Sequence, residues 1–315
     1  MEFRQIQYFA CLFEESSVTR AARRLGIVQP ALSMQIGKLE QELGQKLFER
    51  STQGMIPTAT GLQMYRLFQP VLQDFANAQD QMLKSDEELS GRVRIGMIGS
   101  IAQGVLAETL TDFSRLNPRV MVSVTEGYSS VLADWVAGGQ IDAAIINNPR
   151  RALPLNIEPI VDEDLLLLTG SRNDTQLPQQ IPLRAVATLK LVLPTRQHGL
   201  RAVVENFAQN ENLSLAPVCE TDSLATLVEL VERAGLATVL PRVAVRSLLE
   251  QRRLIGRAIV SPRLSRLVVV VTNPRRTFSP ATAAFVAQLT SRIRALGGEQ
   301  ATSSQGLQVA PATKR

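Results

Sequence analysis

Residues 19–50 read TRAARRLGIVQPALSMQIGKLEQELGQKLFER, and this stretch decides the fold of the N-terminal region. Residues 18–25 predict a short helix, which Gly26 ends because glycine tolerates a left-handed conformation. Pro30 suits the first turn of a second helix over residues 30–43, because its missing N–H would be unpaired there. Two short helices joined by a glycine turn predict a helix-turn-helix, whose second helix fits the major groove of DNA. An ordinary helical hairpin with a solvated outer face is the alternative.

A further helix comes before this pair, because apolar residues recur at helical spacing from Phe3 to Phe13. Residues 19–50 resemble, without a gap, the DNA-binding segment of LysR-type transcriptional regulators. The matching motifs are Ala-Ala-x-x-Leu, Gln-Pro-Ala-Leu-Ser, Leu-Glu-x-Glu-Leu-Gly and Leu-Phe-x-Arg. The resemblance implies an all-α winged helix-turn-helix DNA-binding domain over residues 1–60. Its wing would be a β-hairpin at residues 51–60, and residues 58–61 would open the next helix.

The same resemblance implies which side chains meet DNA. Base edges or phosphates in the major groove would be contacted by Gln29, Pro30, Ser33 and Gln35, and the DNA backbone mainly by Thr19, Arg20, Lys38, Arg50 and Thr58. Glutamine can bond adenine through two hydrogen bonds, whereas Arg and Lys neutralise phosphates. The chain departs from the usual family pattern at Val28, where serine is common, and at Met34 and Gln53, where arginine is common. These departures predict weaker phosphate contacts or a changed base preference.

Residues 61–90 predict a long linker helix through which two chains pair. A row of apolar residues alternates at spacings of three and four, with Gln79 at its one polar position: Tyr65, Phe68, Leu72, Phe75 and Met82. Such a repeat favours pairing with a second helix, although a single helix packed on its own domain is the alternative. Pro70 lies inside the pattern, where it removes a backbone hydrogen bond, and we expect a bend there rather than a domain end.

The C-terminal region, residues 91–298, alternates strand and helix patterns and predicts parallel βαβ units. Its layout resembles the α/β effector domain of the same family, which has the two lobes of a periplasmic-binding-protein-like fold. Lobe one would comprise residues 92–161 and 266–296, and lobe two residues 162–265. The polar residues 299–315 predict a disordered tail. Within the family, residues 126–149 (EGYSSVLADWVAGGQIDAAIINNP) are most similar to regulators of the nitrogen-assimilation-control kind.

A small anionic effector is expected between the lobes, where strands end and helix N-termini offer free N–H groups. The candidate ligands are Ser100, Ile101 and Gln103 from lobe one and Thr195, His198, Arg201 and Thr221 from lobe two. Each has a plainer interpretation as well. Ser100 could be only a helix N-cap, His198 a surface loop residue, and Arg201 a side chain that faces water.

The residue inventory argues against an enzyme. The 315 residues contain one histidine and two cysteines, Cys11 and Cys219, which we interpret as reduced, buried residues. Neither a zinc site nor a catalytic triad is recognisable, and no phosphate-binding loop or dinucleotide fingerprint occurs. No cofactor or metal is therefore expected. The N-terminus lacks an export signal and no segment is apolar enough to cross a membrane, which predicts a cytoplasmic protein. A two-lobed solute-binding protein or an enzyme without a DNA role remains the alternative.

The resemblance implies how such a protein works. Homodimers formed through the linker helix would assemble into a homotetramer, read two half-sites of promoter DNA, and change their contact with RNA polymerase when the effector binds. The net charge of +5 says little about DNA. Residues 1–60 carry seven basic and six acidic side chains, so most of the excess lies in residues 91–315. DNA binding must then depend on where a few polar side chains lie, and we expect a shallow salt dependence.

Overall fold

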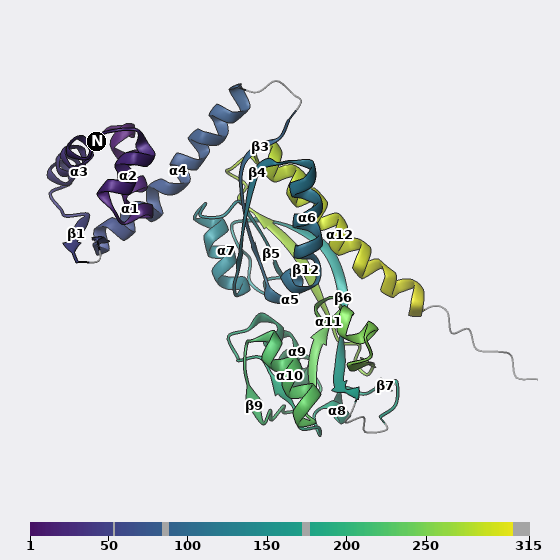
Figure 1. The fold of residues 1–315 in the computed structure, drawn as a ribbon. Helices are drawn as coiled ribbons and strands as arrows, with labels where there is room; N and C mark the ends of the chain where they lie inside the picture. The colour runs from purple at the N-terminus through teal and green to yellow at the C-terminus, as the bar shows by residue number, and fades with distance from the viewer. Residues whose placement is uncertain (53, 84–87, 172–176, 305–315) are drawn as a thin grey trace, which may run out of the picture. The chain divides into compact units, whose positions relative to one another are not determined.

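The computed structural model describes residues 1–52, 54–83, 88–171 and 177–304, which form two compact units (Figure 1). The N-terminal unit consists of α1 (Phe3–Glu15), α2 (Val18–Leu25), α3 (Gln29–Leu43), β1 (Phe48–Ser51), β2 (Gly54–Pro57) and α4 (Ala59–Leu83). The three short helices enclose a core that includes Phe9, Leu12, Leu32 and Leu39. The predicted helix-turn-helix is thereby confirmed as α2, the turn at Gly26 and α3.

Local chemistry explains where these helices begin and end. The Ser17 hydroxyl accepts the N–H of Arg20 and caps α2, and Gly26 ends this helix with a positive φ of 67°. The wing hairpin begins at Phe48, earlier than expected, because β1 pairs with β2 from Phe48 to Ser51. Gly54 at the hairpin turn also approaches α1 closely, since a Cβ there would lie 2.4 Å from the Ser16 carbonyl oxygen.

The long helix α4 differs from its prediction in one respect. It continues through Pro70, as expected, and ends at Leu83; residues 84–87 lie outside the described part of the chain. The apolar row that was expected to pair with a second chain packs partly on its own domain instead. The ring centre of Tyr65 lies 3.9 Å from that of Phe13, on which it stacks, and the ring centre of Phe75 lies 4.5 Å from that of Phe3. Tyr65, Phe68 and Leu72 border the same core. Among the described side chains of α4, the large apolar ones left exposed are Leu62, Leu67, Val71, Phe75 and Met82.

One eight-stranded sheet runs through the C-terminal unit. Its strands are β3 (Ser90–Met97), β4 (Arg119–Glu126), β5 (Ala143–Asn147), β6 (Asn156–Gly170), β7 (Gln180–Ile181), β10 (Thr238–Pro241), β11 (Leu254–Ile259) and β12 (Ser265–Thr272). They lie in the order β4-β3-β5-β12-β6-β11-β7, with β10 also paired to β6. A separate parallel pair joins β8 (Val192–Leu193) to β9 (Cys219–Glu220).

The helices cover this sheet and form two cores. They are α5 (Gly99–Ile101), a π-helical turn (Ala102–Leu106), α6 (Ala107–Leu116), α7 (Ser129–Ala137), α8 (Leu183–Val186), α9 (Gly199–Asn210), α10 (Leu224–Ala234), α11 (Arg242–Glu250) and α12 (Pro280–Ser304). In lobe one, α6 lies beside α12 (Figure 1), and Phe113 meets Phe285 edge-on at 4.9 Å. A second core around Leu167, Val204 and Val231 fills lobe two.

The expectation of parallel βαβ units was wrong in the middle of the sheet. β3 is parallel to β4 and β5, but β12 is antiparallel to both β5 and β6, and β6 is antiparallel to β10 and β11. The reason is that β6 spans both lobes and β12 returns along it. The two cores follow each other along β6, since Val161 packs against the first and Leu165 lies in the second, and the Leu165 N–H donates to the Leu264 carbonyl.

The end of α12 corrects a second expectation. The helix continues to Ser304, so residues 299–304 are helical rather than part of a disordered tail. Gly297 is a packing residue and not a helix stop, because a Cβ there would lie 2.2 Å from Cγ2 of Val161. A glycine inside a helix costs only about 1 kcal/mol relative to alanine. Residues 305–315 of the predicted tail lie outside the described part.

Candidate nucleic-acid interface and ligand pocket

The outer face of α3 carries most of the side chains that we expect at DNA. Gln29, Pro30, Ser33, Met34 and Lys38 are exposed, whereas Leu32, Ile36 and Leu39 hold the opposite face in the core. Val28, which occupies the N-cap position, offers no side-chain hydrogen bond to the helix. Gln35 is half-buried, and its Oε1 accepts a hydrogen bond from Nε2 of buried Gln5 at 3.4 Å. Gln5 thus orients Gln35, a role that the amphipathic pattern of α1 did not predict.

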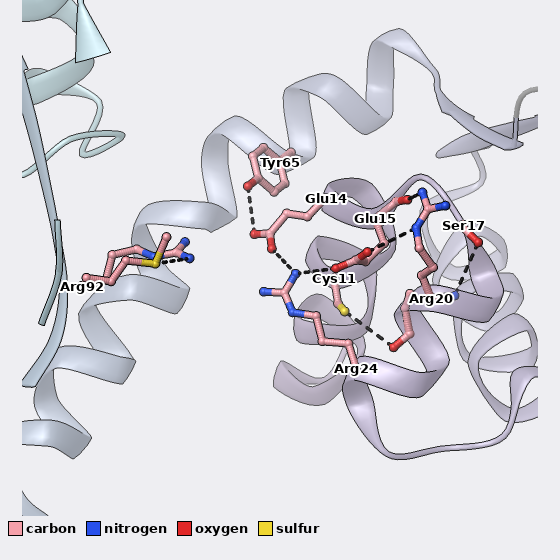
Figure 2. Close-up of polar contacts among 10 residues, drawn as sticks. Cys11, Glu14, Glu15, Ser17, Arg20, Arg24, Tyr65 and Arg92 are labelled. Carbon is pink, nitrogen blue, oxygen red and sulfur yellow. Dashed lines mark hydrogen bonds and ion pairs between the residues drawn. The ribbon is translucent and has the colours of Figure 1, made fainter. Parts of the chain in front are cut away.

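Two of the three arginines of α2, Arg20 and Arg24, form ion pairs with carboxylates of α1 (Figure 2). Arg24 forms ion pairs with Glu14 at 2.7 Å and with Glu15 at 3.2 Å, and the bond to Glu14 raises the pKa of Arg24. Arg20 forms a longer ion pair with Glu15 and also donates to its carbonyl oxygen. Tyr65 of α4 donates to the Glu14 carboxylate at 3.1 Å. This network ties α1, α2 and α4 together and reduces the positive charge that Arg20 can present to phosphates.

Lys38 and Arg50 differ from these arginines. Both are exposed, and no ion pair within the described residues neutralises either one. Lys38 lies on α3 and Arg50 on the wing strand β1. These are the two elements that we expect to contact DNA. Cations without a protein partner contribute most to phosphate binding, since they release counterions without breaking an ion pair.

The remaining predicted contacts lie near the wing. Thr19 is exposed at the start of α2. The Thr58 hydroxyl donates to the Lys46 carbonyl at 2.7 Å and accepts the Gly61 N–H at 3.1 Å, so it caps the start of α4. Gln53 lies outside the described residues.

Glu40 connects α3 to the wing, a role that the sequence pattern did not lead us to predict. Its carboxylate accepts the N–H groups of Leu47 and Phe48, at 2.8 and 3.3 Å, and the Lys46 ammonium at 2.7 Å. Burial acts to raise the pKa of this carboxyl, but these three donors outweigh it and hold the pKa below its usual range. The signal was available, since Glu40 belongs to the Leu-Glu-x-Glu motif that was compared with the family.

A cavity of about 390 Å³ lies between the two lobes of the C-terminal unit. Lobe one lines it with the start of α7 at Ser129 and the end of β5 at Asn147, and lobe two with Gly199 at the start of α9. The Arg150 and Arg151 side chains also border it, as does the Asp134 carboxylate. Two helix N-termini therefore face one cavity, which favours a ligand with negative charge.

Polar atoms without partners point to the same region. Ser129 Oγ and Asn147 Nδ2 are buried, and neither has a hydrogen-bond partner among the described residues. Ser100 Oγ at the start of α5 is also buried without one, but Ser100 does not line the cavity. A Cβ on Gly199 would lie 2.8 Å from Asn147 Nδ2 and 3.2 Å from Ser129 Oγ. Since buried polar groups are normally satisfied, these atoms mark a place where a ligand can supply the missing bonds.

Beside this cavity, a cluster of polar side chains joins the lobes directly. Tyr128 of lobe one donates its hydroxyl to Asp222 of lobe two, and Asp222 also accepts the N–H and hydroxyl of Thr195, at 2.8 and 2.9 Å. The His198 ring lies edge-on to Tyr128, with ring centres 6.0 Å apart. Burial lowers the pKa of His198; it acts to raise that of Asp222, but the hydrogen bonds from Tyr128 and Thr195 outweigh it and lower that pKa.

The predicted effector residues thus fall into two groups. Ser100 is 6 % exposed, Thr195 and His198 lie in the lobe-joining cluster, and Ile101 is fully buried apolar packing. None of the seven predicted residues lines the cavity itself, and Gln103, Thr221 and Arg201 also lie outside the lobe-joining cluster. Gln103 is exposed, and Thr221 bonds the Ser223 N–H.

Arg201 fits neither interpretation that the sequence suggested. Its side chain is 1 % exposed, so it does not face water. Its guanidinium binds Glu205 at 2.8 Å, Glu220 at 3.0 Å and the Pro194 carbonyl at 3.1 Å. Since these acceptors all belong to lobe two, Arg201 holds the start of α9 to β9 within that lobe.

Comparisons with known proteins agree with both units. Residues 3–62 match the family described as bacterial regulatory helix-turn-helix protein, lysR family, and residues 86–294 match the LysR substrate binding domain. The nitrogen assimilation regulatory proteins nac of Klebsiella aerogenes and Escherichia coli K12 are 31% and 30% identical. The matches cover 89% and 79% of this chain and 91% and 81% of those proteins.

Solved structures extend this agreement to the fold. A full-length OxyR variant from Pseudomonas aeruginosa is 25% identical, with a TM-score of 0.72 over 93% of this chain and 98% of that one. The full-length LysR-type regulator CbnR in complex with its target DNA is 20% identical, with a TM-score of 0.68 over 92% of this chain and 99% of that one. The two-domain, two-lobed fold that the sequence predicted is confirmed.

The fold and its two sites define a DNA-binding regulator with an effector domain. This chain belongs to the LysR family of transcriptional regulators. It is accordingly a transcriptional regulator and not an enzyme. Within the described residues, no helix is long and apolar enough to cross a membrane.

Proposed function

We propose that this regulator binds promoter DNA sequence-specifically through α3 and the wing, and that a small anionic effector bound between the lobes modulates this binding. The observation that carries the DNA assignment is the exposed face of α3, where Gln29 and Ser33 lie on the same helix as Lys38, a cation with no ion pair among the described residues. Pro30, Met34 and Gln35 lie beside them, and Arg50, Gln53 and Thr58 would contribute from the wing, with Thr19 and Arg20 at the start of α2. A cytoplasmic location, with access to DNA, is part of this proposal.

The α4 helix is proposed as the dimer interface. Leu67 and Val71 are 62% and 49% exposed and lie one helical turn apart, and Phe75 follows after a further turn. Such a row is unusual on a solvated helix and favours pairing with α4 of a second copy. Two dimers would then form a tetramer that contacts two half-sites and RNA polymerase. Light scattering of a Leu67→Glu variant should show a smaller particle than the wild-type protein if α4 forms this interface.

DNA binding can be tested without knowing the operator. Full-length protein is used to select fragments from a genomic DNA library, and the selected site is then measured by fluorescence anisotropy. We expect a site with two half-sites and an affinity that Ser33→Ala and Gln29→Ala reduce. Gln209→Ala, at an exposed glutamine of the effector domain, serves as the control for a lost polar side chain. Failure to enrich any sequence at low salt would contradict the proposal.

The effector assignment has its own test. Small carboxylates are screened by thermal shift, and a ligand that raises the melting temperature is titrated calorimetrically. We propose that Ser100 of lobe one and Thr195 and His198 of the lobe-joining cluster act on this ligand through the residues that line the cavity, and that Ile101, Gln103, Arg201 and Thr221 do not contact it. Of these, Ser100 carries the strongest support, because its buried hydroxyl has no partner among the described residues. Unchanged affinity in Ser100→Ala would remove Ser100 from the site.

The similarity to the nac proteins suggests a regulator of related type. We propose membership of that subgroup on the basis of the identity along most of the chain. Operator sequences recovered from the genomic selection, compared with those that a nac protein selects under the same conditions, test this assignment.

A further inference from the structure

A buried ion pair at the crossing between the lobes lies next to the ligand cavity. Arg266 on β12 stands opposite Glu163 on β6, and its Nε donates to Oε1 of Glu163 at 2.6 Å. Their side chains are 1% and 3% exposed. The second contact of the guanidinium is with Asn147, because Nη1 of Arg266 donates to Oδ1 of Asn147 at 3.2 Å. The ion pair therefore reaches a residue that lines the cavity.

This contact fixes the direction in which the Asn147 amide points. A guanidinium has only donors, so the amide atom that faces Arg266 must be the acceptor, Oδ1. The donor, Nδ2, then faces away from Arg266, and it is buried with no partner among the described residues. A Cβ on Gly199 would lie 2.8 Å from this Nδ2 and 3.2 Å from the Ser129 hydroxyl, and all three residues line the cavity. The amide cannot rotate by 180° without placing its NH₂ group against the guanidinium.

We propose that Asn147 determines the chemical class of the effector, and that Arg266, held by Glu163, is the positioning residue that keeps Nδ2 directed into the cavity. This inference rests on the proposed function. The group bound there is an oxyanion, a carboxylate or an inorganic oxyanion such as sulfate, which accepts bonds from Asn147 Nδ2 and Ser129 Oγ. The N-termini of α7 and α9 and the Arg150 and Arg151 side chains add positive potential, and Asp134 is the acidic side chain on the lining.

The class of ligand is tested by calorimetric titration of the full-length protein with sulfate, phosphate, acetate and succinate at constant ionic strength. We expect at least one of them to bind, and Asn147→Asp to weaken it at least tenfold, because the variant replaces the donor by a carboxylate oxygen. Asn210→Asp adds the same charge at an exposed residue at the end of α9, outside the cavity lining, and should change the affinity less than threefold. Ser129→Ala, which only removes the hydroxyl, should weaken binding by about threefold or more.

The positioning role needs a variant that removes the ion pair without leaving an unpaired charge. In the double variant Glu163→Met with Arg266→Met, both charges are replaced by apolar side chains, which proteins often tolerate. We expect it to fold and to lose at least fivefold in oxyanion affinity, because the Asn147 amide can then turn its oxygen toward the cavity. A neutron crystal structure of this variant, in which the amide oxygen and nitrogen are distinguishable, reports the rotated amide directly.

Three results would overturn the inference: no member of the panel binds the wild-type protein, Asn147→Asp binds as tightly as wild type, or the double variant keeps full oxyanion affinity. Each is separable from failure of the proposed function. If the wild-type protein still binds its selected DNA site in these cases, the proposed DNA-binding function holds and only the oxyanion assignment is wrong. If it binds no DNA, the proposed function itself fails.

Discussion

The two units use polar side chains in opposite ways. On the DNA-binding unit, Ser33, Lys38 and Arg50 are exposed, and each can be removed without leaving a buried partner unsatisfied. In the effector unit, Asn147, Glu163 and Arg266 are all at least 95% buried and bond one another. The first arrangement makes residues act independently, whereas the second makes them act as a group. Substitutions should therefore alter DNA affinity in small steps on one unit and fold stability in large steps on the other.

The largest effect is expected from Arg266→Met alone. This variant leaves the Glu163 carboxylate buried without its cation, which typically costs about 3–5 kcal/mol of unfolding free energy. Chemical denaturation of the full chain measures it. Arg263→Met is the matched control, because Arg263 pairs with Asp164 at the protein surface with its side chain 63% exposed, and exposed pairs contribute less than about 1 kcal/mol. Equal effects of the two substitutions would contradict the contrast between buried and exposed pairs.

Two helical glycines of the DNA-binding unit should respond in opposite directions. Gly61→Ala should destabilise by about 1–3 kcal/mol, because its Cβ would lie 2.2 Å from the Leu47 carbonyl oxygen. Gly37 in α3 has no atom within 4 Å of the corresponding position, so Gly37→Ala should stabilise by up to about 1 kcal/mol. Thermal unfolding of both variants checks this, and a loss of stability in Gly37→Ala would show that the exposed face of α3 is less free than its geometry indicates.

A smaller effect is expected from pH at the lobe-joining cluster. Burial lowers the pKa of His198, so the unfolded chain takes up a proton before the folded chain does. The neutral histidine therefore supports the fold above its unfolded pKa of about 6.5, and this support is lost as the pH falls below that value. His198→Asn keeps an N-cap for α9 and removes the titration. Between pH 6.5 and 5, the melting temperature of the wild-type protein should fall more than that of the variant. If the two melting temperatures fall in parallel with pH, His198 does not contribute to the pH dependence of stability.

The same contrast explains what the sequence could and could not predict. The helix-turn-helix follows from local signals such as Ser17, Gly26 and Pro30, and its outer face follows from helical spacing. The pocket has no such local signal. Asn147 and Arg266 are 119 residues apart, and their contact depends on the antiparallel return of β12 beside β5 and β6. Alternating strands and helices do not reveal that direction, so the sequence pointed to Arg201 instead of Arg266.

DNA reading by the exposed face of α3 is tested most directly by titrating the full-length protein with its selected DNA site over a range of salt concentrations. We predict that Lys38→Ala weakens binding to all sequences alike and reduces the salt slope by about one. Gln29→Ala should leave the slope unchanged and lose about 1–3 kcal/mol of discrimination at one base pair. If both variants bind the selected site and mismatched sites as the wild-type protein does, α3 does not read the DNA.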